Sequence, residues 1–250
     1  FFNIFSLSLF FIVPKYLVED DGSLGERNDY RCLSLEHKLG LHASPTCVIS
    51  YGDDGDGAIG YLIGEEHQGM RYMFKMMNNA RLGVGVEGLA VAERALQQAS
   101  SFALERRQGK AIGAQAGEQS LIIEHPDVRR MLLTMRAYTD AMRCILYANA
   151  AALDVAKCHP DREERQLASD RAELLTPISK AWCTDLGVEM TSLGIQVHGG
   201  YGYIEETGAA QHYRDIRIAG IYEGTNGIQA IDLVGRKLSM RKGDVVRELL

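Results

Sequence analysis

The chain has 250 residues, of which 46% are hydrophobic and 24% are charged, and its formal net charge is −6 at pH 7. This composition is ordinary for a globular protein with one large domain or two small ones, and the negative charge argues against nucleic acid as a partner. The five scattered cysteines form no Cys-X-X-Cys pair, which favours reduced thiols over a disulfide framework. The seven histidines show no close pairing, so we expect no protein-built metal site.

The first part of the chain, residues 1–64, is predicted to consist of strands and turns. Its opening, FFNIFSLSLFFIV, reads as a buried β-strand or as a start inside a domain, and it is shorter than the roughly 20 apolar residues that cross a bilayer. The run TCVISY reads as another strand, and Gly/Asp-rich loops separate the strands. We therefore expect a fragment that begins within a β-domain and has no membrane span.

From about Glu65 onward, apolar residues recur at three- and four-residue spacing, which predicts helices. The predicted helices cover residues 70–108, 126–158, 163–197, 206–215 and 225–238. Pro126 occupies the favoured first position of the second helix, and Pro177 is a candidate for a kink in the third. Helices with short connections predict an antiparallel bundle. The predicted fold is therefore α+β and mainly α, with a partial β-domain over residues 1–64 and a helical bundle over residues 65–250.

Three glycines, Gly83, Gly85 and Gly88, lie inside the first predicted helix. Each costs a helix about 1 kcal/mol relative to alanine, so we expect the backbone there to approach a partner helix or a ligand closely. Arg81 precedes them on a helix that reads as buried, and a buried arginine needs a partner. Glu223, Glu87 and an anionic ligand are all candidates for that partner.

Two segments combine glycine or arginine with a predicted helix end. In QVHGGYGYIEETG, residues 196–208, a glycine cluster lets backbone amides approach a phosphate or a flat ring, although a helix C-cap and turn is the simpler interpretation. In ALERRQGK, residues 103–110, Arg106 and Arg107 are suited to a pyrophosphate but are also typical of a solvated helix end.

The segment YEGTN places Glu223 two residues before Thr225, the predicted N-cap of the last helix. A carboxylate there is either a residue that favours the helix start or a general base aimed at a substrate. One glutamate alone does not decide between these interpretations.

Taken together, these segments resemble the acyl-CoA dehydrogenase family, in the same order and over nearly the whole chain. The resemblance implies that residues 1–64 are the C-terminal part of the family's middle β-domain and that residues 65–250 are its C-terminal helical-bundle domain, with the N-terminal helical domain absent. The segments LEHKLGLHASPTC, MNNARLGVG, TPISKAWCTDLGVE and HGGYGYIEETGAAQH are most similar to the branch of 3-methylmercaptopropionyl-CoA dehydrogenases.

The resemblance also implies roles for single residues. Glu223 is expected to be the catalytic base. Contacts to the cofactor FAD are expected from Arg106, Gln196, Gly199, Gly200 and Thr225, and contacts to the substrate from Asn78, Arg81, Tyr222 and Gly224. Asn78 departs from the acidic residue that many members have there, and QGK at residues 108–110 departs from the family's FGK.

The activity implied by the resemblance is α,β-dehydrogenation of an acyl-CoA thioester. Glu223 would remove the α-proton, the flavin would accept the β-hydride, and electrons would leave to electron-transfer flavoprotein. The resemblance further implies a homodimer or homotetramer, located in the cytoplasm of a bacterium or in the mitochondrial matrix of a eukaryote. Two alternatives remain open: an acyl-CoA oxidase that passes electrons to O₂, and a non-catalytic helical fragment that lacks flavin.

Overall fold

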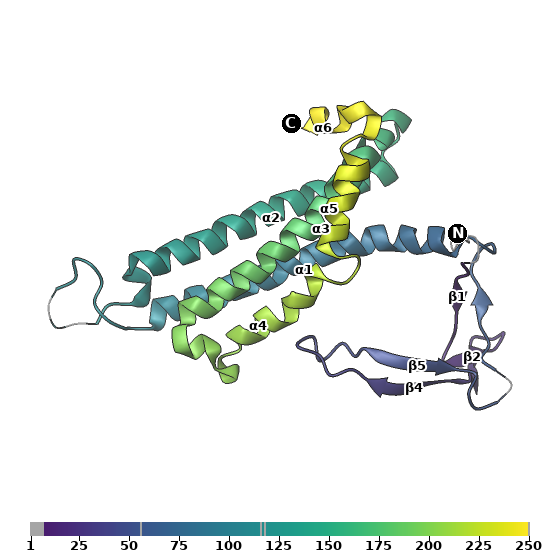
Figure 1. Ribbon diagram of the computed structural model, residues 1–250, viewed down its shortest axis with the longest axis horizontal. Coiled ribbons are helices and arrows are strands. Elements are labelled where there is room, and N and C mark those ends of the chain that lie inside the picture. The colour runs from purple at the N-terminus through teal and green to yellow at the C-terminus, as the bar shows by residue number, and fades with distance from the viewer. Residues whose placement is uncertain (1–7, 56, 116, 118, 250) are drawn as a thin grey trace. The chain divides into compact units, whose positions relative to one another are not determined.

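The computed structural model describes residues 8–55, 57–115, 117 and 119–249 (Figure 1). The chain divides into two compact units, Phe1–Asn78 and Asn79–Leu250, and the division falls within the long helix α1 (Gly69–Glu105). The domain boundary expected after residue 64 stays a prediction. None of the described helices is long and apolar enough to cross a membrane.

The first unit contains short antiparallel strand pairs, and the buried side chain of Asn28 joins the loops between them. The pairs are β1 (Phe11–Ile12) with β6 (Tyr61–Leu62), β2 (Tyr16–Val18) with β3 (Leu24–Arg27), and β4 (Tyr30–Leu35) with β5 (Cys47–Tyr51). The side chain of Asn28 donates to the carbonyl oxygens of Pro14 and Ile59 and accepts from the amide of Ile59. These bonds tie the loops between different pairs together and satisfy the buried amide.

The predicted buried strand at the start of the chain is wrong for the residues that the structure describes as β1. Phe11 and Ile12 expose 49% and 56% of their surface. A pair of two-residue strands has no second layer to cover it within this unit, so its side chains stay accessible. Residues 1–7 of the predicted strand lie outside the described residues. The strand predicted at TCVISY is confirmed as β5.

The second unit is a helical bundle, as predicted. It is built from α1, α2 (Pro126–Cys158), α3 (Arg162–His198), α4 (Ala209–Ile216) and α5 (Asn226–Asp232). Pro126 starts α2, and the side chain of Asp161 caps α3 by accepting from the amides of Glu163 and Glu164. Only residues 159–161 connect α2 to α3, so the two helices run antiparallel, side by side (Figure 1).

Helices α1 and α4 each differ from the prediction at one end, for local reasons. Helix α1 ends at Glu105 rather than at residue 108, because the backbone of Arg106 and Arg107 pairs with residues 121–122. Helix α4 begins at Ala209 rather than at residue 206, because Gly208 adopts a left-handed conformation (φ 80°) after a short 3₁₀ turn. Helix α3 continues through Pro177.

The core of the bundle lies between α1, α2 and α3. On α1 its members are mostly alanines, together with Leu89 and Leu96. Its members on α2 and α3 include Met131, Met135, Met142, Leu146, Cys183, Leu186 and Met190. The alanines allow α1 to approach its neighbours, and the methionines fill the remaining space. Burial raises the pKa of the Cys183 thiol to about 12, so this cysteine is a neutral core residue.

Glycines bring the backbones of α1 and α3 into contact. A Cβ atom added at Gly88 would overlap the carbonyl oxygen of Cys183, and one added at Gly85 would lie 2.8 Å from the carbonyl oxygen of Ser179. On the facing helix, a Cβ at Gly187 would lie 3.1 Å from the Cα of Gly88. The close approach expected at the three glycines is therefore found at Gly85 and Gly88, where the neighbour is a partner helix. It is not found at Gly83, where an added Cβ would meet nothing within 4 Å among the described residues.

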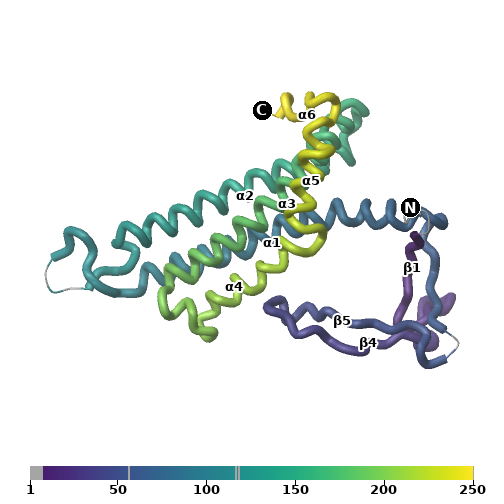
Figure 2. Tube along the Cα trace, in the orientation of Figure 1, coloured from purple at the N-terminus to yellow at the C-terminus, as the bar shows by residue number. Residues whose placement is uncertain are grey.

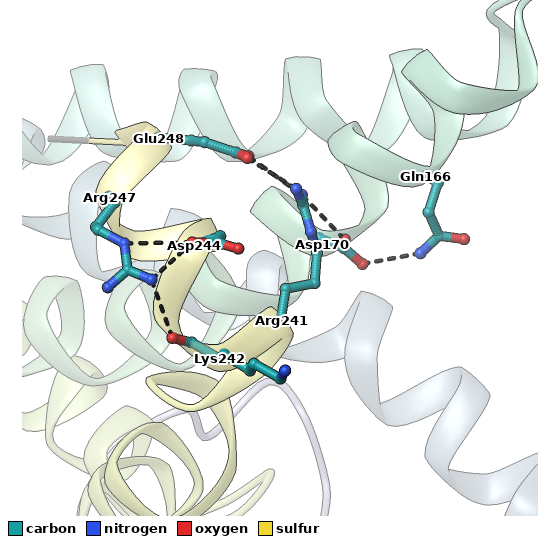
Figure 3. Close-up of polar contacts among 7 residues, drawn as sticks. All are labelled: Gln166, Asp170, Arg241, Lys242, Asp244, Arg247 and Glu248. Atoms are coloured by element: carbon teal, nitrogen blue, oxygen red, sulfur yellow. Dashed lines mark hydrogen bonds and ion pairs between the residues drawn. The ribbon is translucent and has the colours of Figure 1, made fainter.

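The C-terminal end of the chain packs on α3 through ion pairs (Figure 3). Helix α5 ends at Asp232 rather than near residue 238, because the chain continues as a π-helical turn over Leu233–Lys237. A 3₁₀ turn and then α6 (Asp244–Leu249) follow, and the sequence pattern did not predict α6. Arg241 donates to both carboxylate oxygens of Glu248 and lies 3.7 Å from a carboxylate oxygen of Asp170 on α3. Arg241 and Lys242 have φ values of 48° and 59°, so this corner is a left-handed turn that the ion pairs help to hold.

We expect the two glycines Gly88 and Gly83 to respond oppositely to alanine. Gly88→Ala should lower the free energy of unfolding by about 1–3 kcal/mol, because the added Cβ pushes α1 away from α3. Gly83→Ala should raise it by about 0.5–1 kcal/mol, because a Cβ there meets nothing within 4 Å. Urea unfolding of both variants beside the parent chain measures the difference. Unchanged stability of Gly88→Ala would contradict the close helix contact.

Candidate functional site

The turn before α5 holds Glu223 in an unusual backbone conformation. Its φ is 55°, and the following Gly224 has a φ of 83°. The left-handed region costs a residue with a side chain about 1–2 kcal/mol, so the surrounding contacts must hold Glu223 there.

Thr225, not Glu223, caps α5. The Thr225 hydroxyl accepts a hydrogen bond from the amide of Ile228 at 3.2 Å, which confirms the predicted N-cap. In the part of the chain that the structure describes, the Glu223 carboxylate accepts no hydrogen bond and forms no ion pair. Glu223 is half-buried and makes no side-chain hydrogen bond to the start of α5, so it does not cap this helix.

Helix α1 holds this turn from one side. The buried guanidinium of Arg81 donates through Nε to the backbone carbonyl oxygen of Glu223 at 3.3 Å. Of the two glutamates proposed as partners of Arg81, the structure shows a bond to Glu223, through its backbone and not its carboxylate. Glu87 instead accepts a hydrogen bond from the Tyr222 hydroxyl. Burial, and then this bond, raise the pKa of Tyr222, so the phenol stays protonated.

Helix α3 holds the turn from the other side. Lys180 has no exposed surface, and its Nζ donates to Oδ1 of Asn226, the first residue of α5, at 2.8 Å. The Asn226 amide nitrogen donates to Asp185 Oδ1 at 2.7 Å and to Thr184 Oγ1 at 2.9 Å. Burial lowers the pKa of Lys180 to about 8; Arg81 also lowers it, while Asp185 and Glu223 oppose the shift.

The buried side-chain amide of Gln229 bonds the backbone of the same turn. Gln229 is 1% exposed and donates to the backbone carbonyl oxygen of Gly224 at 3.2 Å. A Cβ atom at Gly224 would lie 2.9 Å from the Gln229 amide nitrogen and 3.3 Å from Arg81 Nη2. Glycine is therefore required at residue 224 both for its positive φ and for this confined space.

A second group of predicted residues gathers where α1 and α3 end. The guanidinium of Arg106 lies over the ring of Tyr201, 5.1 Å from its centroid. Gly199 ends α3 with a φ of 61° and donates its amide to the carbonyl oxygen of Gln196. A Cβ added at Gly199 or Gly200 would meet nothing within 4 Å, so the backbone there is open to a large group. A half-buried guanidinium beside open glycine backbone fits an anionic group such as a diphosphate.

The two groups lie far apart along α1, which runs beside α3 (Figure 2). Arg81 and Glu105 are separated by most of the helix, roughly 36 Å at 1.5 Å per residue. The structure thus brings Arg81, Tyr222, Glu223, Gly224 and Thr225 together at one place, and Arg106, Gln196, Gly199 and Gly200 at another. Asn78 is exposed on α1. In the described ranges, no three metal-ligating side chains gather into a metal site.

Residues 67–238 match the family model for the acyl-CoA dehydrogenase C-terminal domain. The chain belongs to the acyl-CoA dehydrogenase family. This result confirms the resemblance seen in the sequence, and the helical bundle is the family's C-terminal domain.

Relatives within the acyl-CoA dehydrogenase family cover nearly all of the chain. It is similar to 3-methylmercaptopropionyl-CoA dehydrogenase of Ruegeria pomeroyi (52% identical over 241 residues, 96% of this chain and 40% of that protein). It is also similar to a butyryl-CoA dehydrogenase of Syntrophomonas wolfei (39% identical, 96% of this chain and 40% of that protein). Among solved structures, an acyl-CoA dehydrogenase from Bacillus anthracis complexed with FAD matches with a TM-score of 0.74 and 25% identity (94% of this chain and 40% of that one). The chain therefore spans about two-fifths of these relatives.

The candidate site includes residues that sequence reasoning missed: Lys180, Asn226 and Gln229. One signal was present in the sequence. Polar residues on α3 recur at four-residue spacing on its buried side, at Thr176, Lys180 and Thr184. A lysine in such a stripe indicates a buried polar contact. Its partner on α5 is 46 residues away and has no local signature.

Alkaline pH should stabilise this chain through Lys180. Below pH 8 the folded and unfolded states both carry the proton, and the fold bears the full cost of the buried ammonium. Between pH 8 and the ordinary value of 10.5, only the unfolded state keeps the proton, so the free energy of unfolding rises by at most about 1.4 kcal/mol per pH unit. Urea unfolding of the parent chain and Lys180→Met, each measured across this range, isolates the effect because other groups titrate alike in both. A difference that does not change with pH would refute it.

Proposed function

We propose that the chain is the base-bearing part of a FAD-dependent acyl-CoA dehydrogenase, in which Glu223 removes the α-proton of an acyl-CoA thioester. The observation that carries this proposal is the state of the Glu223 carboxylate. It has no hydrogen-bond or ion-pair partner among the described residues, while its backbone is held by Arg81 and the next helix is capped by Thr225. An unengaged carboxylate on a fixed backbone is what a general base requires.

The backbone amide of Glu223 supports the same role. Among the described residues it donates to no acceptor, whereas the amides of Ile221 and Tyr222 both donate to Ile218. An available amide beside the base can donate to the thioester carbonyl oxygen, which lowers the pKa of the α-C–H as negative charge develops on that oxygen. Tyr222 supplies an apolar ring surface beside the base, and Gly224 and Arg81 complete the expected substrate contacts.

The open glycine backbone at residues 199–200 and the guanidinium of Arg106 support binding of the FAD diphosphate, with Gln196 beside them. When bound, FAD would supply the acceptor for the hydride from the β-carbon. Arg81, which bonds the backbone of Glu223, lies tens of ångströms from Arg106 along α1, so we propose that Glu223 and Arg106 of one chain serve different flavins. This arrangement requires at least a homodimer, and it is also compatible with a homotetramer. Thr225, beside the base, is the expected contact near the reactive ring.

The relatives also suggest a specific substrate and electron acceptor. A relative 52% identical to this chain is a 3-methylmercaptopropionyl-CoA dehydrogenase, which favours a short acyl chain of that kind. We further propose Asn78 as a contact to the CoA part, electron-transfer flavoprotein as the acceptor, and the bacterial cytoplasm as the compartment.

The substitution Glu223→Gln tests the base directly. Glutamine keeps the size and most of the polarity of the side chain but accepts no proton at neutral pH. In the flavin-loaded enzyme, obtained from the chain itself or from a chimera in which it replaces the matched two-fifths of the Ruegeria pomeroyi protein, FAD should remain bound. Bleaching of the flavin band by acyl-CoA should slow by at least about 10²-fold.

Glu189→Gln is the matched control for this test, because Glu189 is an exposed glutamate on α3. Bleaching of Glu223→Gln at the parent rate would remove Glu223 as the base. Peroxide release in air by the parent enzyme would make it an oxidase and leave the role of Glu223 intact. A colourless parent protein would favour the non-catalytic alternative.

A further inference from the structure

The proposed chemistry leaves one buried cation without a role. Lys180 has no exposed surface, and among the described residues its ammonium forms no ion pair within 4.0 Å. Its side-chain contact is the hydrogen bond to Asn226 Oδ1. Burying an ammonium against a neutral amide costs free energy relative to an apolar residue. Such a contact is explained if it has a structural effect that an apolar residue would not have.

The contact fixes the orientation of the Asn226 side chain. A lysine ammonium only donates and an aspartate carboxylate only accepts, so the Asn226 oxygen must face Lys180 and its nitrogen must face Asp185. In this orientation the nitrogen also reaches Thr184 Oγ1 and, at 3.2 Å, the carbonyl oxygen of Ala181. All four partners belong to α3. An apolar residue in place of Lys180 would take this donor from the Asn226 oxygen, so the side chain would be held to α3 by fewer bonds.

Asn226 is the first residue of α5 and lies three positions after Glu223. Its bonds to α3 therefore fix one end of the left-handed turn, while Arg81 on α1 fixes the carbonyl oxygen of Glu223 at the other. If the α3 end is released, Glu223 can return to the more favourable negative φ. That change rotates its Cβ, and with it the carboxylate, away from the direction observed here.

We propose that Lys180 and Asn226 are positioning residues that hold Glu223 in its left-handed conformation and so aim its carboxylate. The functional part of this inference rests on the proposed role of Glu223 as the base. The conformational part concerns the chain alone and is tested without substrate.

Hydrogen–deuterium exchange of the chain tests the conformational part. Asn226→Ala and Lys180→Met should each raise the exchange rate of amides in residues 222–229 by about tenfold or more, because the turn opens more often. Met190→Ala is the control, since it removes a buried α3 side chain of the core away from the turn. Exchange in residues 222–229 that stays at the parent rate, or that rises equally in Met190→Ala, would overturn the proposal.

Asn226→Asp separates positioning from charge compensation. If Asn226 served only to accept from Lys180, a carboxylate would do so better, and the turn would become more protected. If Asn226 positions the turn through Asp185 and Ala181 as well, the carboxylate loses those donor bonds and repels Asp185. We expect faster exchange in residues 222–229 of Asn226→Asp, and increased protection there would contradict positioning.

The rate of flavin reduction tests the functional part. In the flavin-loaded enzyme, Asn226→Ala and Lys180→Met should slow reduction by roughly 10- to 100-fold at saturating acyl-CoA, as a displaced base does, with little change in the concentration needed for saturation. If Glu223→Gln slows reduction and these variants do not, the positioning role is wrong. If Glu223→Gln itself has no effect, the proposed function fails, and the exchange experiment alone decides whether these residues hold the turn.

Discussion

The contact between the backbones of α1 and α3 is the constraint on which the site depends. Gly85 and Gly88 of α1 meet Ser179 and Cys183 of α3 at distances that exclude any Cβ atom. Arg81 lies one turn before Gly85 on its helix, and Lys180 directly follows Ser179 on the other. The same contact that closes the core therefore sets the spacing of the two cations that reach the turn around Glu223.

The left-handed turn at Glu223 is held by side chains from α1, α3 and α5. Arg81 bonds one of its carbonyl oxygens from α1, and Gln229 bonds another from α5. Lys180 orients Asn226 from α3. Because these bonds act on the backbone and on the capping region, the carboxylate of Glu223 is left unengaged. The structure thus separates the residues that fix the turn from the residue that is proposed to act on substrate.

The helices could be predicted from sequence because their signals are local. Pro126 and the three- and four-residue apolar spacing determine α2, and Thr225 was identified correctly as the cap of α5. The exposure of β1 could not be predicted, because burial of a short apolar strand depends on what covers it. Helix α6 also escaped prediction, since it is short and its position depends on the ion pairs of Arg241 with α3 and with α6 itself.

The candidate site was also only partly predictable from the sequence. Motif resemblance identified Glu223 and Arg81, but it did not show that Arg81 contacts the backbone of Glu223. Lys180 and Asn226 were missed, because their hydrogen bond joins residues far apart in the sequence. The polar spacing of Thr176, Lys180 and Thr184 indicates a buried polar contact, but the partner of Lys180 on α5 is set by how α3 and α5 pack, which no local pattern encodes.

Hydrogen–deuterium exchange of the Gly85→Ala variant tests this dependence most directly. A Cβ at Gly85 would press on Ser179 and Leu146, beside Lys180, without touching the turn itself. Gly83→Ala places the same methyl group on the same helix in open space. We predict that Gly85→Ala, but not Gly83→Ala, speeds exchange of the amides in residues 222–229 by about tenfold while most of α2 keeps its protection. Unchanged exchange in the turn of Gly85→Ala would contradict the claim that the α1–α3 contact holds Glu223 in place.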